Sequence, residues 1–205
     1  MFSGGSLAVM NGGRIGWLRG CAELTLRALA TLGILHLAVA LPALAIKAMR
    51  GNVSTPFPGV GNFRMVTATL WRGAAPTPTG YQELAAAGVA RVVDLRAEAD
   101  VIVVQELVAG LDLEVVSVPI RDGQVPNPRQ LEAITAVVER DGTVVFVHCG
   151  AGVGRTGSAV AALRVSAGAA AVSELVEALS HGPLSLEQQV FILCQPGTGK
   201  GASVP

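Results

Sequence analysis

Residues 143–165 read TVVFVHCGAGVGRTGSAVAALRV, and this stretch decides the fold class. Its first part, Thr143 to His148, is mostly apolar and rich in β-branched side chains, which predicts a strand of the kind buried on both faces. Small residues follow Cys149, and a helix-forming run begins near Arg155. A buried strand that leads through a glycine-rich turn into a helix is typical of α/β domains with a parallel sheet.

The chain on both sides of this stretch repeats the alternation of short apolar runs with helical stretches. Further strands are predicted at 69–72, 89–95 and 113–120, and helices from Pro78 to Gly88, up to Ala109, at 128–140, and over most of the remainder to Cys194. We therefore expect an α/β fold in which a central, mainly parallel sheet is flanked by helices.

The turn after Cys149 has the composition of an anion-binding loop. It consists of Gly150, Ala151, Gly152, Val153 and Gly154. Glycines allow successive backbone N–H groups to turn toward one point, and the helix that follows adds the positive end of its dipole there. Ligand sites of parallel sheets lie at the carboxyl ends of the strands, where Cys149 falls. The sequence therefore predicts a site for an anion with a sulfur atom at its base.

Four side chains in this segment are candidates for chemistry. The field that binds an anion also lowers the pKa of the Cys149 thiol and favours the nucleophilic thiolate. Arg155, six positions later, offers a planar fork for two phosphoryl oxygens. Thr156 can donate its hydroxyl to the sulfur, and His148 is expected to orient the loop by a hydrogen bond to backbone. A lone Cys is more often a small buried hydrophobe, but this combination of residues opposes that reading.

Transfer of a phosphoryl group to sulfur needs a proton for the leaving oxygen. Asp122 is the best candidate for this general acid, because it lies 27 residues before Cys149 in VPIRDGQVPNP (118–128), a loop framed by Gly and Pro. Asp94, in VVDLR, is a competitor, but its place inside a strand favours pairing with backbone or with Arg96. The chemistry so assembled requires no metal and no cofactor.

Composition excludes some classes of partner and framework. The 205 residues include 15 basic and 15 acidic side chains, and no basic stripe indicates a nucleic-acid partner. The three cysteines, Cys21, Cys149 and Cys194, lie far apart without metal-ligand spacing, which favours free thiols over a disulfide framework.

The mean hydropathy of +0.53 has a local cause in the N-terminal fifth of the chain. Residues 28–46 read ALATLGILHLAVALPALAI without a formal charge, and basic residues flank them. This run predicts a single-pass membrane helix; a buried core helix and a cleaved signal peptide are the alternatives. Basic residues are balanced on its two sides, so the side of the membrane on which the domain lies stays open. The predicted organisation is an N-terminal segment (1–27), a transmembrane helix (28–47), a linker (48–62), the catalytic domain (63–195) and a flexible tail (196–205).

The motifs match a known family. HCGAGVGRTG (148–157) resembles the signature H-C-x-x-G-x-x-R-[ST]-G of the protein tyrosine and dual-specificity phosphatases. Residues 122–126 look like the mobile general-acid loop of that family, although Ile120 and Arg121 replace its usual Trp-Pro. Residues 62–96 resemble the opening of compact bacterial and atypical dual-specificity phosphatases. LSLEQQVFI (184–192) resembles the glutamine loop of the tyrosine phosphatases, with Gln188 at its second glutamine and Leu184 at its first, water-positioning one.

The resemblance implies a phosphatase acting on a phosphorylated protein or a small phosphate monoester. Cys149 would form a phosphocysteine, Arg155 would bind the phosphate, and Asp122 would protonate the leaving group and then activate water. Phosphotyrosine and phosphoserine or phosphothreonine are the implied substrates. A lipid or inositol phosphatase is the alternative: the membrane helix favours it, whereas the neutral Ala151 and Val153 do not. A catalytically inactive phosphate-binding module and a sulfurtransferase fit less well, because nucleophile and acid are both present and the Cys-to-Arg spacing is six.

Overall fold

The computed structural model describes residues 41, 45–46, 48–49 and 54–197. The chain divides into two compact units, Met1–Pro42 and Ala43–Pro205, and the fold below is that of the second. Among the described residues no helix has the length and apolar character needed to cross a membrane. The predicted membrane helix (28–47) lies outside the described residues except at positions 41, 45 and 46, as does the predicted tail from residue 198 onward.

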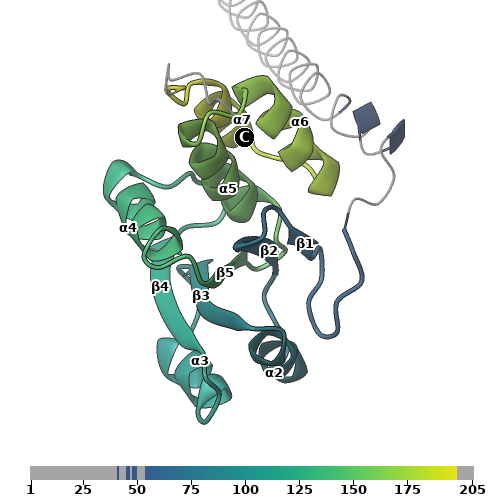
Figure 1. The fold of residues 1–205 in the computed structure, drawn as a ribbon. Coiled ribbons are helices and arrows are strands. Elements are labelled where there is room, and N and C mark those ends of the chain that lie inside the picture. Colours follow the sequence, from purple (N-terminus) through teal and green to yellow (C-terminus); the bar gives the residue numbers. More distant parts are fainter. Residues whose placement is uncertain (1–40, 42–44, 47, 50–53, 198–205) are drawn as a thin grey trace, which may run out of the picture. The chain divides into compact units, whose positions relative to one another are not determined.

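A five-stranded sheet forms the centre of the domain, in the order β1-β2-β5-β3-β4 (Figure 1). The strands are β1 (Arg64–Met65), β2 (Leu70–Ala74), β3 (Val89–Arg96), β4 (Glu114–Ile120) and β5 (Val144–Cys149). β1 pairs with β2 in antiparallel fashion, and all other pairs are parallel. The expected α/β domain with a mainly parallel sheet is confirmed, and the two-residue strand β1, which the sequence did not predict, makes the sheet mixed.

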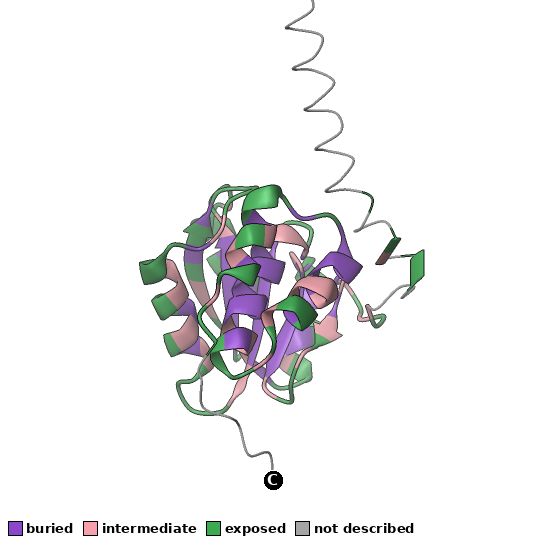
Figure 2. Ribbon diagram, turned by 90° about the horizontal axis from the view of Figure 1, so that it is seen from above, coloured by how far each residue is buried: buried purple, intermediate pink, exposed green. Residues whose placement is uncertain are grey.

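Helices cover both faces of the sheet (Figure 1). α2 (Pro78–Ala86) and α3 (Val101–Val108) cover one face, α4 (Pro128–Val138) and α5 (Gly154–Ser166) cover the other, and α6 (Ala171–His181) and α7 (Leu186–Leu193) pack on α5. Alternate residues of β5 point to opposite faces: Phe146 contacts the α2/α3 side, and Val145 and Val147 contact the α4/α5 side. The central strands and α5 are therefore the most buried elements (Figure 2), and β5 is the buried strand that its composition predicts.

Local capping sets the helix starts, and α2 and α4 begin at the predicted Pro78 and Pro128. The side chain of Thr77 accepts a hydrogen bond from the Gly80 N–H, with Pro78 in the first turn, and Asp100 caps α3 in the same way. Asn127 and Gln130 form a reciprocal capping box at the start of α4. Each cap satisfies backbone donors that the first helical turn leaves without partners.

The second half of the predicted linker (48–62) is packed against the domain and does not act as a linker. Phe57 stacks on Phe63 at a ring-centroid distance of 4.3 Å, and Val60 is buried beside them in the α2/α3-side core. Gly59, at φ +70°, lies so close to α2 that a Cβ would stand 2.5 Å from the Gly80 nitrogen. Residues 57–62 therefore belong to the folded domain, because burial of aromatic surface outweighs the flexibility that the Gly and Pro content suggests.

Candidate active site

Strand β5 carries Cys149 to the carboxyl edge of the sheet, between β2 and β3. Cys149 stands opposite Ala74 of β2, and His148 stands opposite Asp94 of β3. The cysteine is 3 % exposed and is a free thiol. The loop that follows it, residues 150–154, leads directly into α5, so the sulfur lies at the start of that helix.

Three carbonyl groups of the 150–154 loop are held from outside it. The Ala75 N–H donates to Gly150 O (3.0 Å), Asn62 Nδ2 to Ala151 O (2.9 Å) and Arg72 Nη2 to Gly152 O (2.7 Å). Burial lowers the pKa of Arg72 to about 10, so this guanidinium stays protonated at neutral pH. These bonds fix the loop backbone from outside, and the N–H groups of Gly152 and of Thr156, just beyond the loop, donate toward the Cys149 sulfur, as in an anion nest.

Close packing leaves no room for side chains at one position of this loop. Gly152 has φ +70°, and a Cβ there would stand 2.4 Å from the Gly73 carbonyl carbon and 2.5 Å from the Ala74 nitrogen. The loop backbone therefore lies directly on β2, which only glycine permits.

The surroundings of Cys149 act on its pKa in opposite directions. Burial raises the pKa of the thiol, whereas the hydroxyl and N–H of Thr156, the N–H of Gly152 and the charge of Arg155 lower it. The net effect is a pKa below the ordinary value, so the thiolate is more populated at neutral pH than in an ordinary cysteine. Thr156 is fully buried, and its hydroxyl has no non-sulfur partner among the described residues.

His148 and Asp94 lie in neighbouring strands of the sheet, outside the 150–154 loop. Burial lowers the pKa of His148 to about 4, so the ring is neutral at neutral pH, and its Nδ1 lies 3.1 Å from the Cys149 carbonyl oxygen, to which it can donate. Asp94 is buried and accepts hydrogen bonds from the backbone and guanidinium of Arg96. Burial raises the pKa of Asp94, but the Arg96 bonds outweigh it and lower the pKa overall. Asp94 is thus an ionised structural group with no proton to give.

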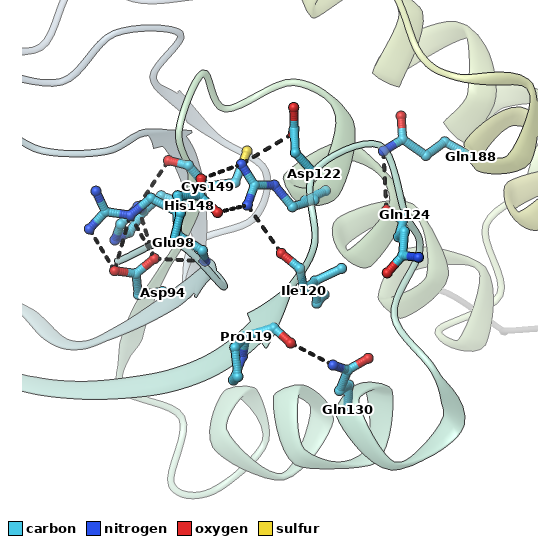
Figure 3. Close-up of polar contacts among 12 residues, drawn as sticks. Asp94, Glu98, Pro119, Ile120, Asp122, Gln124, Gln130, His148, Cys149 and Gln188 are labelled. Carbon is cyan, nitrogen blue, oxygen red and sulfur yellow. Dashed lines mark hydrogen bonds and ion pairs between the residues drawn. The ribbon is translucent and has the colours of Figure 1, made fainter. Parts of the chain in front are cut away.

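Arg155 is held by a carboxylate that the sequence analysis missed. Glu98 accepts from Nη1 (2.7 Å) and Nη2 (2.8 Å) of Arg155, and the Ile120 carbonyl also accepts from Nη1 (3.1 Å) (Figure 3). These bonds lower the pKa of Glu98 to about 2. The buried Nε of Arg155 has no hydrogen-bond partner within the described part of the chain, so this N–H is a donor available to a bound anion. The available signal for Glu98 was its position just after β3, the neighbour of β5.

Asp122 lies at the rim of the same site. It occupies a tight turn in which the Gln124 N–H donates to the Arg121 carbonyl (3.2 Å) and Gly123 takes φ +77°. Its Oδ1 stands 3.2 Å from Nη2 of Arg155, although 89 % of the side chain is exposed (Figure 3). The turn therefore brings a solvent-accessible carboxyl group to the guanidinium of Arg155. This guanidinium lies beside the 150–154 loop, which is called the anion loop below.

Leu184 and Gln188, the two residues singled out in the glutamine loop, are both buried. Leu184 is buried in the apolar cluster between α5, α6 and α7. Gln188 is 2 % exposed; its Nε2 donates to the Gln124 carbonyl (3.2 Å) and its Oε1 accepts from the Ser185 N–H (3.0 Å). A Cβ on Gly154 would stand 2.8 Å from the same amide group. Gln188 thus lies between the anion loop and the Asp122 turn with its amide already engaged.

The structure thus brings Cys149, Arg155, Thr156 and Asp122 together around one anion loop, from β5, α5 and the β4–α4 connection. A thiol of lowered pKa, a preorganised guanidinium and an accessible carboxyl group are the parts that phosphoryl transfer to sulfur needs. In the described portion of the chain, no group of three or more His, Cys, Asp or Glu side chains is placed to hold a metal ion. The arrangement defines a candidate site in which a thiol, a guanidinium and a carboxyl group surround one glycine-rich loop.

Comparison with known proteins assigns the family. Residues 62–195 match the sequence model described as "DSP-PTPase phosphatase fused to NAD+ Kinase". The chain therefore belongs to this family of dual-specificity-type phosphatases. No curated protein sequence matches the chain.

Solved structures similar in fold to this chain include those of TpbA, SIW14 and PTPMT1. P. aeruginosa TpbA has a TM-score of 0.58 at 19 % identity, covering 68 % of this chain and 87 % of its own. The core catalytic domain of the PP-IP phosphatase SIW14 from S. cerevisiae, in complex with citrate, has a TM-score of 0.59 at 16 % identity, covering 70 % and 88 %. PTPMT1 in complex with PI(5)P has a TM-score of 0.53 at 19 % identity, covering 64 % and 92 %. At these identities the likeness establishes a shared fold.

Proposed function

We propose that this phosphatase hydrolyses phosphate monoesters through a phosphocysteine intermediate formed on Cys149. One observation carries the proposal: the thiol, the guanidinium of Arg155 and the carboxyl group of Asp122 converge on one anion loop, with Asp122 Oδ1 3.2 Å from Arg155 Nη2. Phosphate bound by the loop N–H groups and by Nε of Arg155 would place its phosphorus atom over the sulfur and its ester oxygen toward the rim.

In the first step the thiolate attacks phosphorus. An S–P bond forms, the P–O bond to the substrate breaks, and the departing oxygen takes its proton from Asp122 in the carboxylic acid form. Arg155 stabilises the charge on the equatorial oxygens, and its guanidinium does not have to reorient because Glu98 and the Ile120 carbonyl already fix it.

In the second step water attacks the phosphocysteine. Asp122, now a carboxylate, takes a proton from the water, an O–P bond forms, and the S–P bond breaks to release phosphate and the thiolate. The buried hydroxyl of Thr156 stabilises the thiolate as it leaves, because it can donate to the sulfur.

The preferred substrates in this proposal are phosphorylated side chains of proteins, phosphotyrosine first and phosphoserine or phosphothreonine second. The exposure of the rim side chains Asp122 (89 %) and Glu98 (56 %) supports a side chain of a protein as substrate, because a large molecule can reach these groups. The second candidate is an inositol or lipid phosphate, which is favoured by the fold shared with the PP-IP phosphatase SIW14 and with PTPMT1, whose structure contains PI(5)P. The neutral residues of the 150–154 loop oppose it, because additional phosphates call for additional cations.

A substrate panel tests this proposal. We expect release of phosphate from p-nitrophenyl phosphate and from a phosphotyrosyl peptide, with a higher kcat/KM for that peptide than for an inositol polyphosphate or a phosphatidylinositol phosphate in vesicles. Acid quenching during turnover should trap phosphate on Cys149, identified by mass spectrometry of the peptide. Phosphate release without trapped phosphocysteine would contradict the covalent route. A kcat/KM at least tenfold higher for the inositol substrates would establish the second candidate.

We also propose that residues 28–46 anchor the chain in a membrane as a single-pass helix, since the run is apolar on every face. We expect the full chain to fractionate with membranes and to resist extraction by high salt or carbonate. A chain that starts near Asn52 should be soluble and should still hydrolyse p-nitrophenyl phosphate. A full chain that is soluble without detergent, together with an aggregated and inactive truncation, would refute the anchor in favour of a core helix.

A further inference from the structure

We infer that Ser185 and Gln188, at the start of α7, are positioning residues that hold the Asp122 turn over the anion loop. The segment concerned is residues 121–127, called the acid loop below, which connects β4 to α4. The inference rests on the proposed function, because it gives these two residues a part in delivering the general acid.

The acid loop is held by hydrogen bonds to its backbone. Ser185 Oγ donates to the Gly123 carbonyl (2.9 Å), and Gln188 Nε2 donates to the Gln124 carbonyl (3.2 Å; Figure 3). The strand end before the loop is held by the Arg155 bond to the Ile120 carbonyl (3.1 Å). The base of the loop is closed by Gln130 Nε2, which donates to the Pro119 carbonyl (2.6 Å; Figure 3).

Side-chain burial contributes little to the position of the turn itself. The four residues 121–124 are all exposed, and the first buried side chain after Ile120 is that of Pro126. The Asp122 carboxyl group contacts Arg155 but is otherwise open to solvent. Apart from the Arg155 contact, the bonds from Ser185 and Gln188 are therefore the tertiary contacts nearest to Asp122, since residues 123 and 124 follow it directly.

Both side chains are themselves fixed by the helix that they start. Ser185 Oγ accepts from the Gln188 N–H (3.2 Å), and Gln188 Oε1 accepts from the Ser185 N–H (3.0 Å), so the pair forms a capping box. The hydroxyl of Ser185 thus accepts a hydrogen bond from the helix and donates its only proton to the acid loop. A pair locked in this way is preorganised to hold the loop at a defined distance from the anion loop, against which Gln188 packs at Gly154.

The second step of the reaction depends on the same contacts. The position at which tyrosine phosphatases carry a water-binding glutamine holds the buried Leu184, and the amide of Gln188 is engaged in the capping box and the acid loop. Asp122 is then the group that orients and deprotonates the water, so its position affects both steps.

Substitution of Ser185 tests the inference. Ser185→Gly removes the donor to the Gly123 carbonyl and keeps an acceptable N-cap, whereas Ser185→Thr keeps the hydroxyl. We expect Ser185→Gly to lower kcat/KM for phenyl phosphate, a poor leaving group, by about three- to tenfold, the worth of one hydrogen bond. The value for p-nitrophenyl phosphate should change less than about twofold, because a good leaving group needs little protonation. Ser185→Thr should restore the wild-type values for both substrates.

Two controls separate positioning from loss of stability and from failure of the proposed function. Thr77→Gly removes the equivalent cap from α2, away from the acid loop; it should match Ser185→Gly in Tm and leave both substrates unaffected. In an Asp122→Asn background, Ser185→Gly should have no further effect. Equal losses on the two substrates, or losses that add in that background, would overturn the inference. Activity that survives Cys149→Ser would instead overturn the proposed function and leave the Ser185 result to be judged on the leaving-group split alone.

Discussion

Replacing Cys149 by serine is expected to lower turnover of p-nitrophenyl phosphate by at least about 10³-fold, the scale on which loss of an activated nucleophile acts. The physical reason is the acidity of the group. The Thr156 hydroxyl, the N–H groups of the loop and the charge of Arg155 lower the pKa of a thiol below its ordinary value. A serine hydroxyl begins far higher on the pKa scale, and the same field cannot ionise it at neutral pH.

Phosphate affinity should survive this substitution. The loop N–H groups and Arg155, and not the sulfur, provide the donors, and the loop is held from outside by Asn62, Arg72 and Ala75. Direct titration of the variant with inorganic phosphate by calorimetry, together with the Tm, measures this part of the prediction. Residual activity within tenfold of the wild type, with an unchanged Tm, would contradict the covalent mechanism.

The local part of the site could be predicted from sequence because it is contiguous. β5, the glycine-rich loop and the start of α5 follow one another over residues 144–156, so the order of residues almost dictates the placement of Cys149, Arg155 and Thr156. The place of Asp122 could be predicted from the sequence for a different reason. A polar residue just after a strand of a parallel sheet lies at the same edge as every other strand end, and Gly123 and Pro126 indicated a loop there.

The supporting contacts could not be predicted, because they join segments far apart in the chain. Glu98 reaches Arg155 across 57 positions, and Asn62 reaches the Ala151 carbonyl across 89. Both depend on the strand order β2-β5-β3, which places the ends of β2 and β3 on either side of β5. No period or motif in the sequence determines that order. The core packing of Phe57 and Val60 was missed for a similar reason, since Trp71 and Phe146 complete that cluster from other elements.

Asp122→Asn is expected to lower kcat/KM for phenyl phosphate by roughly 10²–10⁴-fold, the range for a positioned general acid. The amide has nearly the shape of the carboxyl group, so the turn around Gly123 should form as before. It cannot give a proton to the leaving oxygen, however, nor take one from water. The loss should shrink steadily across a series of aryl phosphates as the leaving group becomes more acidic, because a more stable phenolate departs without protonation.

The competing assignment is Asp94, and the structure makes the two readily distinguishable. Asp94 is buried and ionised in its pairing with Arg96, so Asp94→Asn should lower the Tm and reduce kcat/KM by a similar factor for every leaving group. Asp122 is 89 % exposed, so Asp122→Asn should leave the Tm within about a degree of the wild type, as is usual for surface substitutions. The measurement is a plot of log(kcat/KM) against leaving-group pKa for the wild type and both variants. A steeper slope for Asp122→Asn alone assigns the general acid to Asp122, whereas a steeper slope for Asp94→Asn alone would move that role to the buried carboxylate.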